Sequence, residues 1–251
     1  MAERRKSPLE IETVEAHLCT VDLRLKILSQ VPFFAGLAAE EIEAINQLFR
    51  EQGFSAGESI YYAGDPARRL YVVADGRVKL LRHTESGKDV TLEVLTPGEF
   101  FGSLASLGDE TFPDTAVALT ATCALGIGRE DFRAILETYP PVAVKMLEIT
   151  ASRLKAAHEM VRQLSAHSVE RRIAYSLLKL GEKFGREDEV GLLIQLPLSR
   201  DDLAEMSGTT TESASRVMSQ LQKKGLIHSG RQWVAIRDRA GLQALLGDEL
   251  D

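Results

Sequence analysis

Apolar residues in the C-terminal third of the chain recur at the three- and four-residue spacings of amphipathic helices. One such run begins after Ser199, and Asp202 stands three residues later, which is the sequence form of a capping box. Leu203 and Met206 form the apolar side of this short segment. Gly208 follows, and glycine readily takes the positive φ of a tight turn between helices. The pattern therefore predicts a short capped helix that ends in a tight turn.

A second helix is predicted directly after this turn, with Thr209 or Thr210 as its N-cap. Its apolar face consists of Ala214, Val217 and Leu221. Its other face carries short polar groups, one acceptor and one forked donor: Thr211, Glu212, Ser215, Arg216 and Ser219. Such side chains suit base edges in the major groove of double-stranded DNA. The segment Lys223, Lys224 and Gly225 then ends the helix with two cations and a C-cap glycine.

Two short β-rich runs follow, Leu226 to His228 and Trp233 to Ile236, with a turn expected at Ser229–Gly230. Six Arg or Lys residues and a single acid lie between Ser213 and Arg239, although the whole chain has a net charge of −7. A basic segment on an acidic protein is typical of a DNA contact surface. Capped helix pairs also occur in helical domains without a DNA role, but the charge favours a helix-turn-helix that binds a DNA operator.

Residues 53–128 show a different pattern, in which short β-rich runs alternate with turn signals. A spacing of roughly 8–12 residues between turns is typical of an antiparallel sandwich or barrel. The runs are Ser59–Tyr62, Leu70–Ala74, Val78–Arg82, Val90–Leu95 and the strands within Ala116–Ile127. Helices are predicted on either side, at Val21–Leu28, Ala38–Phe49 and Asp131–Glu137.

A long helix is predicted from Pro140–Pro141 onward. One stripe along it keeps the unbroken spacing of a coiled-coil seam: Leu147, Thr150, Leu154, Ala157, Val161 and Leu164. A second stripe suits packing on the β-rich domain: Val142, Met146, Ile149, Ala156 and Met160. Two apolar sides favour a homodimer, although one wide core face on a monomer would give the same pattern. The pattern breaks at residues 166–168, a predicted hinge, and a helix at Val169–Phe184 and a polar loop at Lys183–Glu189 follow.

The composition restricts the classes of function. The 251 residues allow two modest domains, and 44% hydrophobic and 27% charged residues are normal for a soluble globular protein. No apolar run approaches the roughly 20 residues of a membrane span, and no secretion signal is visible. The two cysteines, Cys19 and Cys123, indicate no disulfide framework, and a reducing cytoplasm is expected. No nucleophile–base pair, metal-ligand cluster or phosphate loop is visible, so no enzyme is predicted.

Four segments together resemble the Crp/Fnr family of bacterial transcription regulators, and the resemblance runs from Val31 to Arg239. They are YYAGDPARRLYVVADGRVKLL, TPGEFFGSLASLG, VERRIAYSLLKL and LSRDDLAEMSGTTTESASRVMSQLQKKGLI. The resemblance implies an α+β fold: an antiparallel β-roll like that of cyclic nucleotide-binding domains, a long dimerisation helix and a winged helix-turn-helix. It also implies RNA polymerase as a partner and activation as a role. The implied divisions are an N-terminal segment at 1–22, partly disordered, a β-roll at 23–139, the helix and hinge at 140–167, and a DNA-binding domain at 168–251.

The effector pocket that the resemblance implies would be lined by Gly102, Ser103, Asp114, Thr115, Ala157 and His158. In the cAMP-binding branch a Glu binds the ribose, and an Arg followed by Ser or Thr binds the cyclic phosphate. Here Ser103 replaces that Glu, and Pro113–Asp114 replaces the pair. Proline cannot bind a phosphate through its side chain, and aspartate would repel it. Ala157 and His158 replace two hydroxyl residues that would meet the adenine. An effector other than cAMP, or control by protein abundance, is therefore predicted.

The oxygen-sensing branch of the family holds an iron–sulfur cluster through four cysteines, and this chain has two. Cys123 stands where the β-roll cysteine of that branch falls, and is most simply a buried core residue. No cofactor or metal site is therefore predicted. Some family members sense gases through haem, and His158 is the position from which haem ligation would act on the long helix. A haem- or redox-based sensor is the alternative prediction, with ordinary helix contacts as the simpler interpretation of His158.

The recognition helix resembles that of the Fnr branch, whose E-x-x-S-R signature appears here from Glu212 to Arg216. The resemblance implies that Glu212 accepts from cytosine N4, Arg216 donates to guanine O6 and N7, and Ser215 makes a third base contact. Helix capping by Glu212 and a phosphate contact by Arg216 are the alternatives. The implied operator is an inverted repeat with a half-site like TTGAT. Phosphate contacts are expected from Lys223, Lys224, Arg231 and Gln232.

Overall fold

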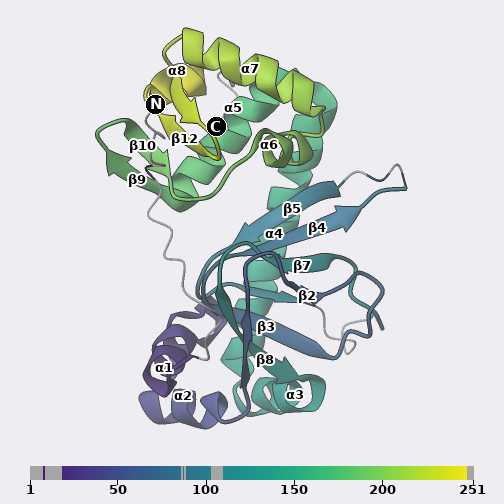
Figure 1. The fold of residues 1–251 in the computed structure, drawn as a ribbon. Helices are drawn as coiled ribbons and strands as arrows, with labels where there is room; N and C mark the ends of the chain where they lie inside the picture. The colour runs from purple at the N-terminus through teal and green to yellow at the C-terminus, as the bar shows by residue number, and fades with distance from the viewer. Residues whose placement is uncertain (1–7, 9–18, 86, 88, 103–109, 248–251) are drawn as a thin grey trace. The chain divides into compact units, whose positions relative to one another are not determined.

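The computed structural model describes residues 8, 19–85, 87, 89–102 and 110–247 (Figure 1). The chain divides into two compact units, one of residues 13–156 and one that contains residues 157–251. None of the helices in these described stretches is long and apolar enough to cross a membrane. The expectation of partial disorder within residues 1–22 falls mostly outside the described residues.

The described part of the first unit opens with helix α1 (Val21–Gln30), a short 3-10 helix η1 (Pro32–Phe34) and helix α2 (Ala39–Asn46). Thr20 is the N-cap of α1, because its Oγ1 accepts a hydrogen bond from the Leu23 amide at 3.3 Å. The predicted first helix is thereby confirmed. The second ends three residues before the predicted Phe49, because the chain turns there toward the first strand.

Two four-stranded antiparallel sheets make up the β-roll among the residues described in this unit, in the orders β1–β8–β3–β6 and β2–β7–β4–β5 (Figure 1). The bounds are β1 Arg50–Phe54, β2 Ser59–Tyr61, β3 Arg69–Asp75, β4 Val78–His83, β5 Asp89–Leu95, β6 Phe100–Gly102, β7 Thr115–Ala118 and β8 Thr122–Gly128. The predicted antiparallel arrangement is confirmed. The sequence pattern did not predict β1 or β6. The polar segment of β1 is a strand because it pairs with β8 from Arg50↔Gly126 to Phe54↔Thr122.

Two apolar clusters hold this unit together. The first packs α1, η1, α2 and α3 (Arg129–Thr138) against residues of β3 and β8. Its aromatic rings meet edge to face, as in Phe33 and Phe100, whose centroids are 5.1 Å apart. The second cluster fills the β-roll and contains the rings of Tyr61, Tyr71 and Phe101. One cluster therefore supports the helices, and the other fills the interior of the β-roll.

The long helix α4 (Pro140–Ala166) has the predicted start and ends at the predicted break. From its second stripe, Val142 is buried in the first cluster and Met146 and Ile149 pack against it, whereas Ala156 is exposed. The seam residues face solvent, with exposed fractions of 70% for Leu147 and 56% for Leu154. The other predicted seam residues, Thr150, Ala157, Val161 and Leu164, are also exposed, and so is Val144, which the sequence pattern did not include. A row of apolar side chains this exposed indicates a surface that another molecule covers.

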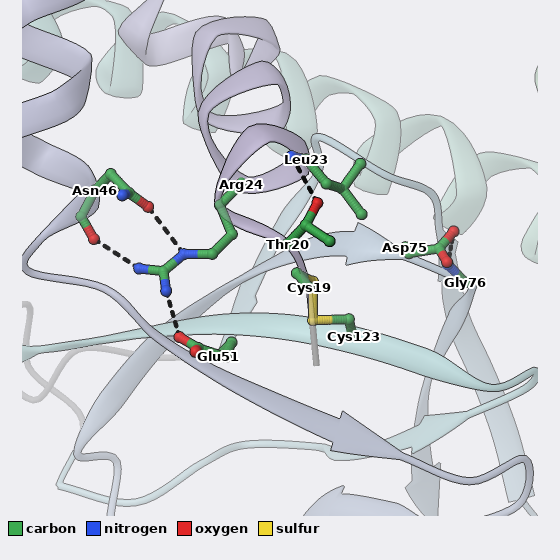
Figure 2. Close-up of a disulfide and its surroundings, with 9 residues drawn as sticks. All are labelled: Cys19, Thr20, Leu23, Arg24, Asn46, Glu51, Asp75, Gly76 and Cys123. Atoms are coloured by element: carbon green, nitrogen blue, oxygen red, sulfur yellow. Dashed lines mark hydrogen bonds and ion pairs between the residues drawn. A yellow bond between two sulfur atoms is a disulfide. The ribbon is translucent and has the colours of Figure 1, made fainter. Parts of the chain in front are cut away.

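Cys19 and Cys123 form a disulfide bond, with Cα atoms 6.1 Å apart, and they are 104 positions apart in sequence (Figure 2). The expectation of two separate thiols is therefore wrong. Cys123 is buried in β8 as predicted, but it is not free. Spacing could not reveal the pair, because the residues meet only when the start of α1 docks on the sheet that contains β8.

The described part of the second unit packs its helices with a four-stranded antiparallel sheet of order β11–β12–β10–β9 (Figure 1). The bounds are α5 Val169–Phe184, β9 Gly185–Asp188, β10 Gly191–Ile194, α6 Arg200–Met206, α7 Thr211–Lys223, β11 Ile227–Gly230, β12 Trp233–Ile236 and α8 Arg239–Ala244. The predicted helix Val169–Phe184 is confirmed. The predicted loop at Lys183–Glu189 is wrong, because this polar segment contains β9, whose backbone pairs with β10.

Candidate functional site

Helices α6 and α7 form the predicted helix-turn-helix. Ser199 Oγ accepts from the Asp202 amide at 3.0 Å, and Asp202 Oδ2 accepts from the Ser199 amide at 2.9 Å, so the predicted capping box is present. Gly208 in the turn has a φ of +56°, and a Cβ there would lie 2.9 Å from Cδ2 of Leu164. The positive φ therefore favours glycine at this turn, whereas the end of the Leu164 side chain could move aside.

Helix α7 begins at Thr210, whose Oγ1 accepts from the Ser213 amide at 3.2 Å. Its buried side consists of Ala214, Val217, Met218 and Leu221, of which Met218 was not predicted. The predicted polar face is exposed or half-buried and consists of Thr211, Glu212, Ser215, Arg216 and Ser219. Arg216 Nη2 donates to Glu212 Oε1 at 2.8 Å. The structure therefore brings the acceptor and the forked donor of this face together.

A hollow of about 580 Å³ lies beside α7 and strand β11, and we name it the α7–wing hollow. Its lining residues are Arg200, Ser219, Gln222, Lys223, Ser229 and Gly230. Arg200 Nη2 donates to Ser229 Oγ at 2.8 Å, and that hydroxyl donates to Gln222 Oε1 at 2.8 Å. Burial lowers the pKa of Arg200, but a guanidinium keeps its charge in proteins. The hollow therefore combines two cations with neutral polar groups, which suits a phosphate.

Arg200 and Gln222 are not among the residues that the sequence pattern predicted for DNA contacts. A signal for Arg200 was present, because it is a cation in the first turn of α6, where the helix dipole disfavours positive charge. Such a mismatch with local preference is typical of residues kept for function. Gln222 carried no comparable signal, since an exposed glutamine near the end of a helix is common.

The wing hairpin differs from its prediction. Its two-residue turn is Arg231–Gln232, and the predicted turn residues Ser229 and Gly230 belong to β11. A Cβ at Gly230 would collide with the indole of Trp233, so this glycine makes room for a ring rather than for a turn. Gln232 has a φ of +62° and takes the left-handed conformation of the turn.

The other predicted phosphate contacts lie in different surroundings. Lys223 and Arg231 are exposed. Lys224 instead pairs with α5, its Nζ lying 2.7 Å from Oε1 of Glu170. Ion pairs with this much exposure contribute little free energy, so Lys224 could exchange Glu170 for a phosphate.

The residues predicted to line an effector pocket belong to several elements of the chain. Gly102 ends β6 with a φ of +85°, and Thr115 is buried in β7 with its Oγ1 accepting a backbone amide at 3.0 Å. Ser103 lies outside the described residues, while Ala157 and His158 are exposed on α4. Among the described residues, no group of three or more His, Cys, Asp or Glu could hold a metal ion.

Asp114 contacts the aromatic side chains that fill the β-roll. The rings of Tyr61 and Phe112 stack with centroids 3.8 Å apart, and the Tyr61 hydroxyl donates to Asp114 Oδ1 at 2.9 Å. Burial raises the pKa of Asp114, and the hydrogen bond from Tyr61 opposes this shift only in part. The pKa of Tyr61 is also raised, mainly by burial and secondly by the charge of Asp114. A desolvated acid and stacked rings therefore occupy this part of the roll.

Two family models match the chain. The cyclic nucleotide-binding domain matches residues 51–139, and the Crp-like helix-turn-helix domain matches residues 171–245. The "Cyclic AMP receptor protein" of Thermus thermophilus is 35% identical over 214 residues, which are 85% of this chain and 96% of that protein. The chain belongs to the Crp/Fnr family.

Other Crp/Fnr proteins are similar over most of their length. The "Transcriptional activator protein anr" of Pseudomonas aeruginosa is 26% identical over 216 residues, which are 86% of this chain and 88% of that protein. The solved structure of FixK2 from Bradyrhizobium japonicum has a TM-score of 0.70 and 26% identity, and the match covers 78% of this chain and 96% of that one. The predicted α+β fold and the predicted Crp/Fnr membership are therefore confirmed, and the chain is a transcription regulator with a DNA-binding helix-turn-helix.

Proposed function

We propose that this Crp/Fnr regulator is a homodimeric activator, which works in the cytoplasm, binds an inverted repeat in double-stranded DNA and acts with RNA polymerase. The observation that carries the proposal is the exposed Glu212–Arg216 pair on α7, the helix that also lines the α7–wing hollow. A base-reading pair and a cationic hollow on one helix supply both parts of a sequence-specific interface. The relative from Pseudomonas aeruginosa is named an activator, which favours activation.

Three residues of α7 read bases in this proposal. Arg216 donates its fork to guanine O6 and N7, Glu212 accepts from cytosine N4, and Ser215 makes a third base contact. The half-site resembles TTGAT. Thr211 and Ser219 influence the outer bases less strongly, because each hydroxyl already has a partner: Thr211 donates to Asp201 at 2.5 Å and Ser219 to the Ser215 carbonyl at 2.9 Å.

Phosphates are held by the cations around α7 and the wing. The α7–wing hollow offers Arg200 and Lys223, and the hairpin turn offers Arg231. Lys224 adds a weaker contact, because it must first leave Glu170. These contacts set the register of the protein on DNA but carry no sequence information.

The second copy in the proposed dimer covers the exposed row of α4. Leu147 and Leu154 are the most exposed leucines of that row. Burying such side chains against their own copies removes apolar surface from water, which favours association at roughly 25 cal/mol per Å². A symmetric pair of reading helices would then face the two halves of an inverted repeat.

The effector in this proposal is not cAMP, although one relative is named a cyclic AMP receptor protein. Asp114 stands where a phosphate-binding hydroxyl residue is found in the cAMP-binding branch, and its carboxylate would repel the phosphate. The stacked rings of Tyr61 and Phe112 occupy space within the same region of the roll. Control comes from another effector or from the abundance of the protein.

Selection of DNA tests the proposal. The full-length protein is incubated with genomic fragments, and the bound fragments are sequenced. We expect enrichment of inverted repeats with TTGAT-like halves, and one dimer per repeat by light scattering. Enrichment without a shared motif, or with a single unpaired half-site, would contradict the proposed reading. Sequencing of transcripts with and without the protein then shows whether nearby genes rise, as activation requires.

A further inference from the structure

The disulfide joins two parts of the first unit that lie far apart in sequence. Cys19 directly precedes Thr20, the N-cap of α1, and Cys123 lies in β8 between β1 and β3 (Figure 2). Cys123 is fully buried, and Cys19 retains an exposed fraction of 6%. The bond therefore connects the start of α1 to a central strand of the sheet.

We infer that Cys19 and Cys123 form a reversible thiol–disulfide switch, in which the oxidised protein binds its operator more tightly. The inference rests on the proposed function, because a regulator of chromosomal DNA works where thiols are kept reduced. Disulfides in that compartment are mostly transient, and they are catalytic or redox-sensing. No reaction of the regulator calls for a catalytic disulfide, which leaves sensing.

Opening the bond frees Cys19 but not α1, because a separate network holds that helix. The Arg24 guanidinium donates from Nε to Asn46 Oδ1 at 2.9 Å, from Nη2 to the Asn46 carbonyl at 2.9 Å, and from Nη1 to Glu51 Oε2 at 2.5 Å (Figure 2). Ile27 and Leu28 of α1 are buried in the first cluster. Reduction is thus a local change rather than an unfolding of the β-roll.

The change reaches α4 through continuous packing. Cys19 and Cys123 belong to the same apolar cluster as Val142, and Met146 and Ile149 of α4 pack against that cluster. The exposed seam is on the same helix. Loosening the cluster removes support from the first half of α4, so the reduced protein presents a less ordered seam, dimerises less and binds DNA more weakly.

The chemistry requires only a peroxide and a dithiol. A Cys19 thiolate attacks hydrogen peroxide, which leaves a sulfenic acid and, with a proton, water. The Cys123 thiol then attacks that sulfur, and the disulfide and a second water form, so two thiols are oxidised and one peroxide is reduced. In reduction, a dithiol attacks the more accessible Cys19 sulfur, Cys123 leaves, and the second thiol of the reductant releases Cys19. Burial of Cys123 makes both directions slow.

The test uses the full-length protein in two states, one treated with hydrogen peroxide and one with dithiothreitol. Thiol alkylation and mass spectrometry count free thiols, hydrogen exchange follows residues 140–150, and fluorescence anisotropy measures operator binding. We expect free thiols only after reduction, faster exchange in residues 140–150 of the reduced protein, and an operator affinity lower by about fivefold or more, a typical coupling between two sites.

Two variants complete the test. Cys19→Ala removes the bond at the more accessible position and should behave like the reduced protein in both states. Ser29→Ala shortens an exposed side chain of α1 and should keep the full redox response. Free thiols after peroxide treatment, or identical exchange and affinity in both states, overturn the switch. A redox-dependent change in exchange without operator binding in either state supports the redox control of α4 and refutes the proposed DNA binding instead.

Discussion

Arg216 Nη2 lies 2.8 Å from Glu212 Oε1, one turn away on α7, and both side chains are mostly exposed, with fractions of 68% and 83%. A pair this exposed adds little to stability. Its effect is on geometry, because each side chain restrains the position of the other on the exposed polar face of α7. On DNA the ion pair would break at a small energetic cost, and each group would bind a base edge instead.

Replacing Arg216 should therefore change sequence preference more than stability. Arg216→Ala is expected to weaken binding to the consensus site by about 1–3 kcal/mol. On a site in which the guanine is changed, the variant and the unaltered protein should bind equally well. Anisotropy titrations of both proteins on both sites measure this. Lys179→Ala is the matched control, because it removes one exposed cation from α5 in the same unit. Equal losses on both sites would make Arg216 a phosphate contact.

Arg200 and Lys223 should act on every sequence alike. Arg200→Ala and Lys223→Ala are each expected to weaken consensus and altered sites equally and to lower the salt slope by about one. The slope comes from titrations over a series of salt concentrations. Ser229→Ala keeps both charges but removes the partner of Arg200, so affinity should fall while the slope stays. A sequence-dependent loss for Lys223→Ala would place it at a base instead.

The sequence pattern predicted α7 correctly because the residues of its buried face and of its exposed face all lie within one short segment. Features that depend on distant residues were hidden. The strand β1 is polar and is a strand only through its pairing with β8, and the disulfide joins positions 104 apart. The hairpin turn was misplaced because Gly230 signals a turn in sequence, while in the fold it accommodates the ring of Trp233. Arg200 was overlooked because its role depends on Ser229, which lies in the wing.

The seam of α4 makes a prediction about assembly. Leu154→Glu places a charge on an exposed apolar row, where dimerisation would bury it against its own copy. The variant should be monomeric and should have lost most of its operator affinity, as light scattering and anisotropy would show. Ser152→Glu adds the same charge at an exposed position about 200° around the helix and should remain dimeric. A dimeric Leu154→Glu protein would refute the seam.

Cyclic AMP should not bind at physiological concentration. Asp114 offers the phosphate a repelling carboxylate, and Pro113 offers its side chain no hydrogen-bond donor. Calorimetric titration should give no heat of binding, with the Cyclic AMP receptor protein of Thermus thermophilus as the positive control. A micromolar dissociation constant would contradict the prediction and would mean that the residues around Asp114 rearrange.

Asp114 also makes a prediction about pH, since burial raises its pKa in the folded protein. Just above the ordinary pKa of an aspartate, the folded protein then holds a proton that the unfolded chain has lost. Stability therefore falls as the pH rises through this window, and above it the folded protein carries a desolvated carboxylate.

Asp114→Asn keeps the acceptor for Tyr61 without the charge, so this variant should melt at a higher temperature than the unaltered protein at pH 7, and the difference should shrink toward acidic pH. Tyr61→Phe removes the donor, which leaves the carboxylate less stabilised, and its deficit should grow as the pH rises. Melting curves of the three proteins between acidic and neutral pH decide the matter: an Asp114→Asn protein that is less stable at every pH would show that the charged hydrogen bond outweighs the cost of burial.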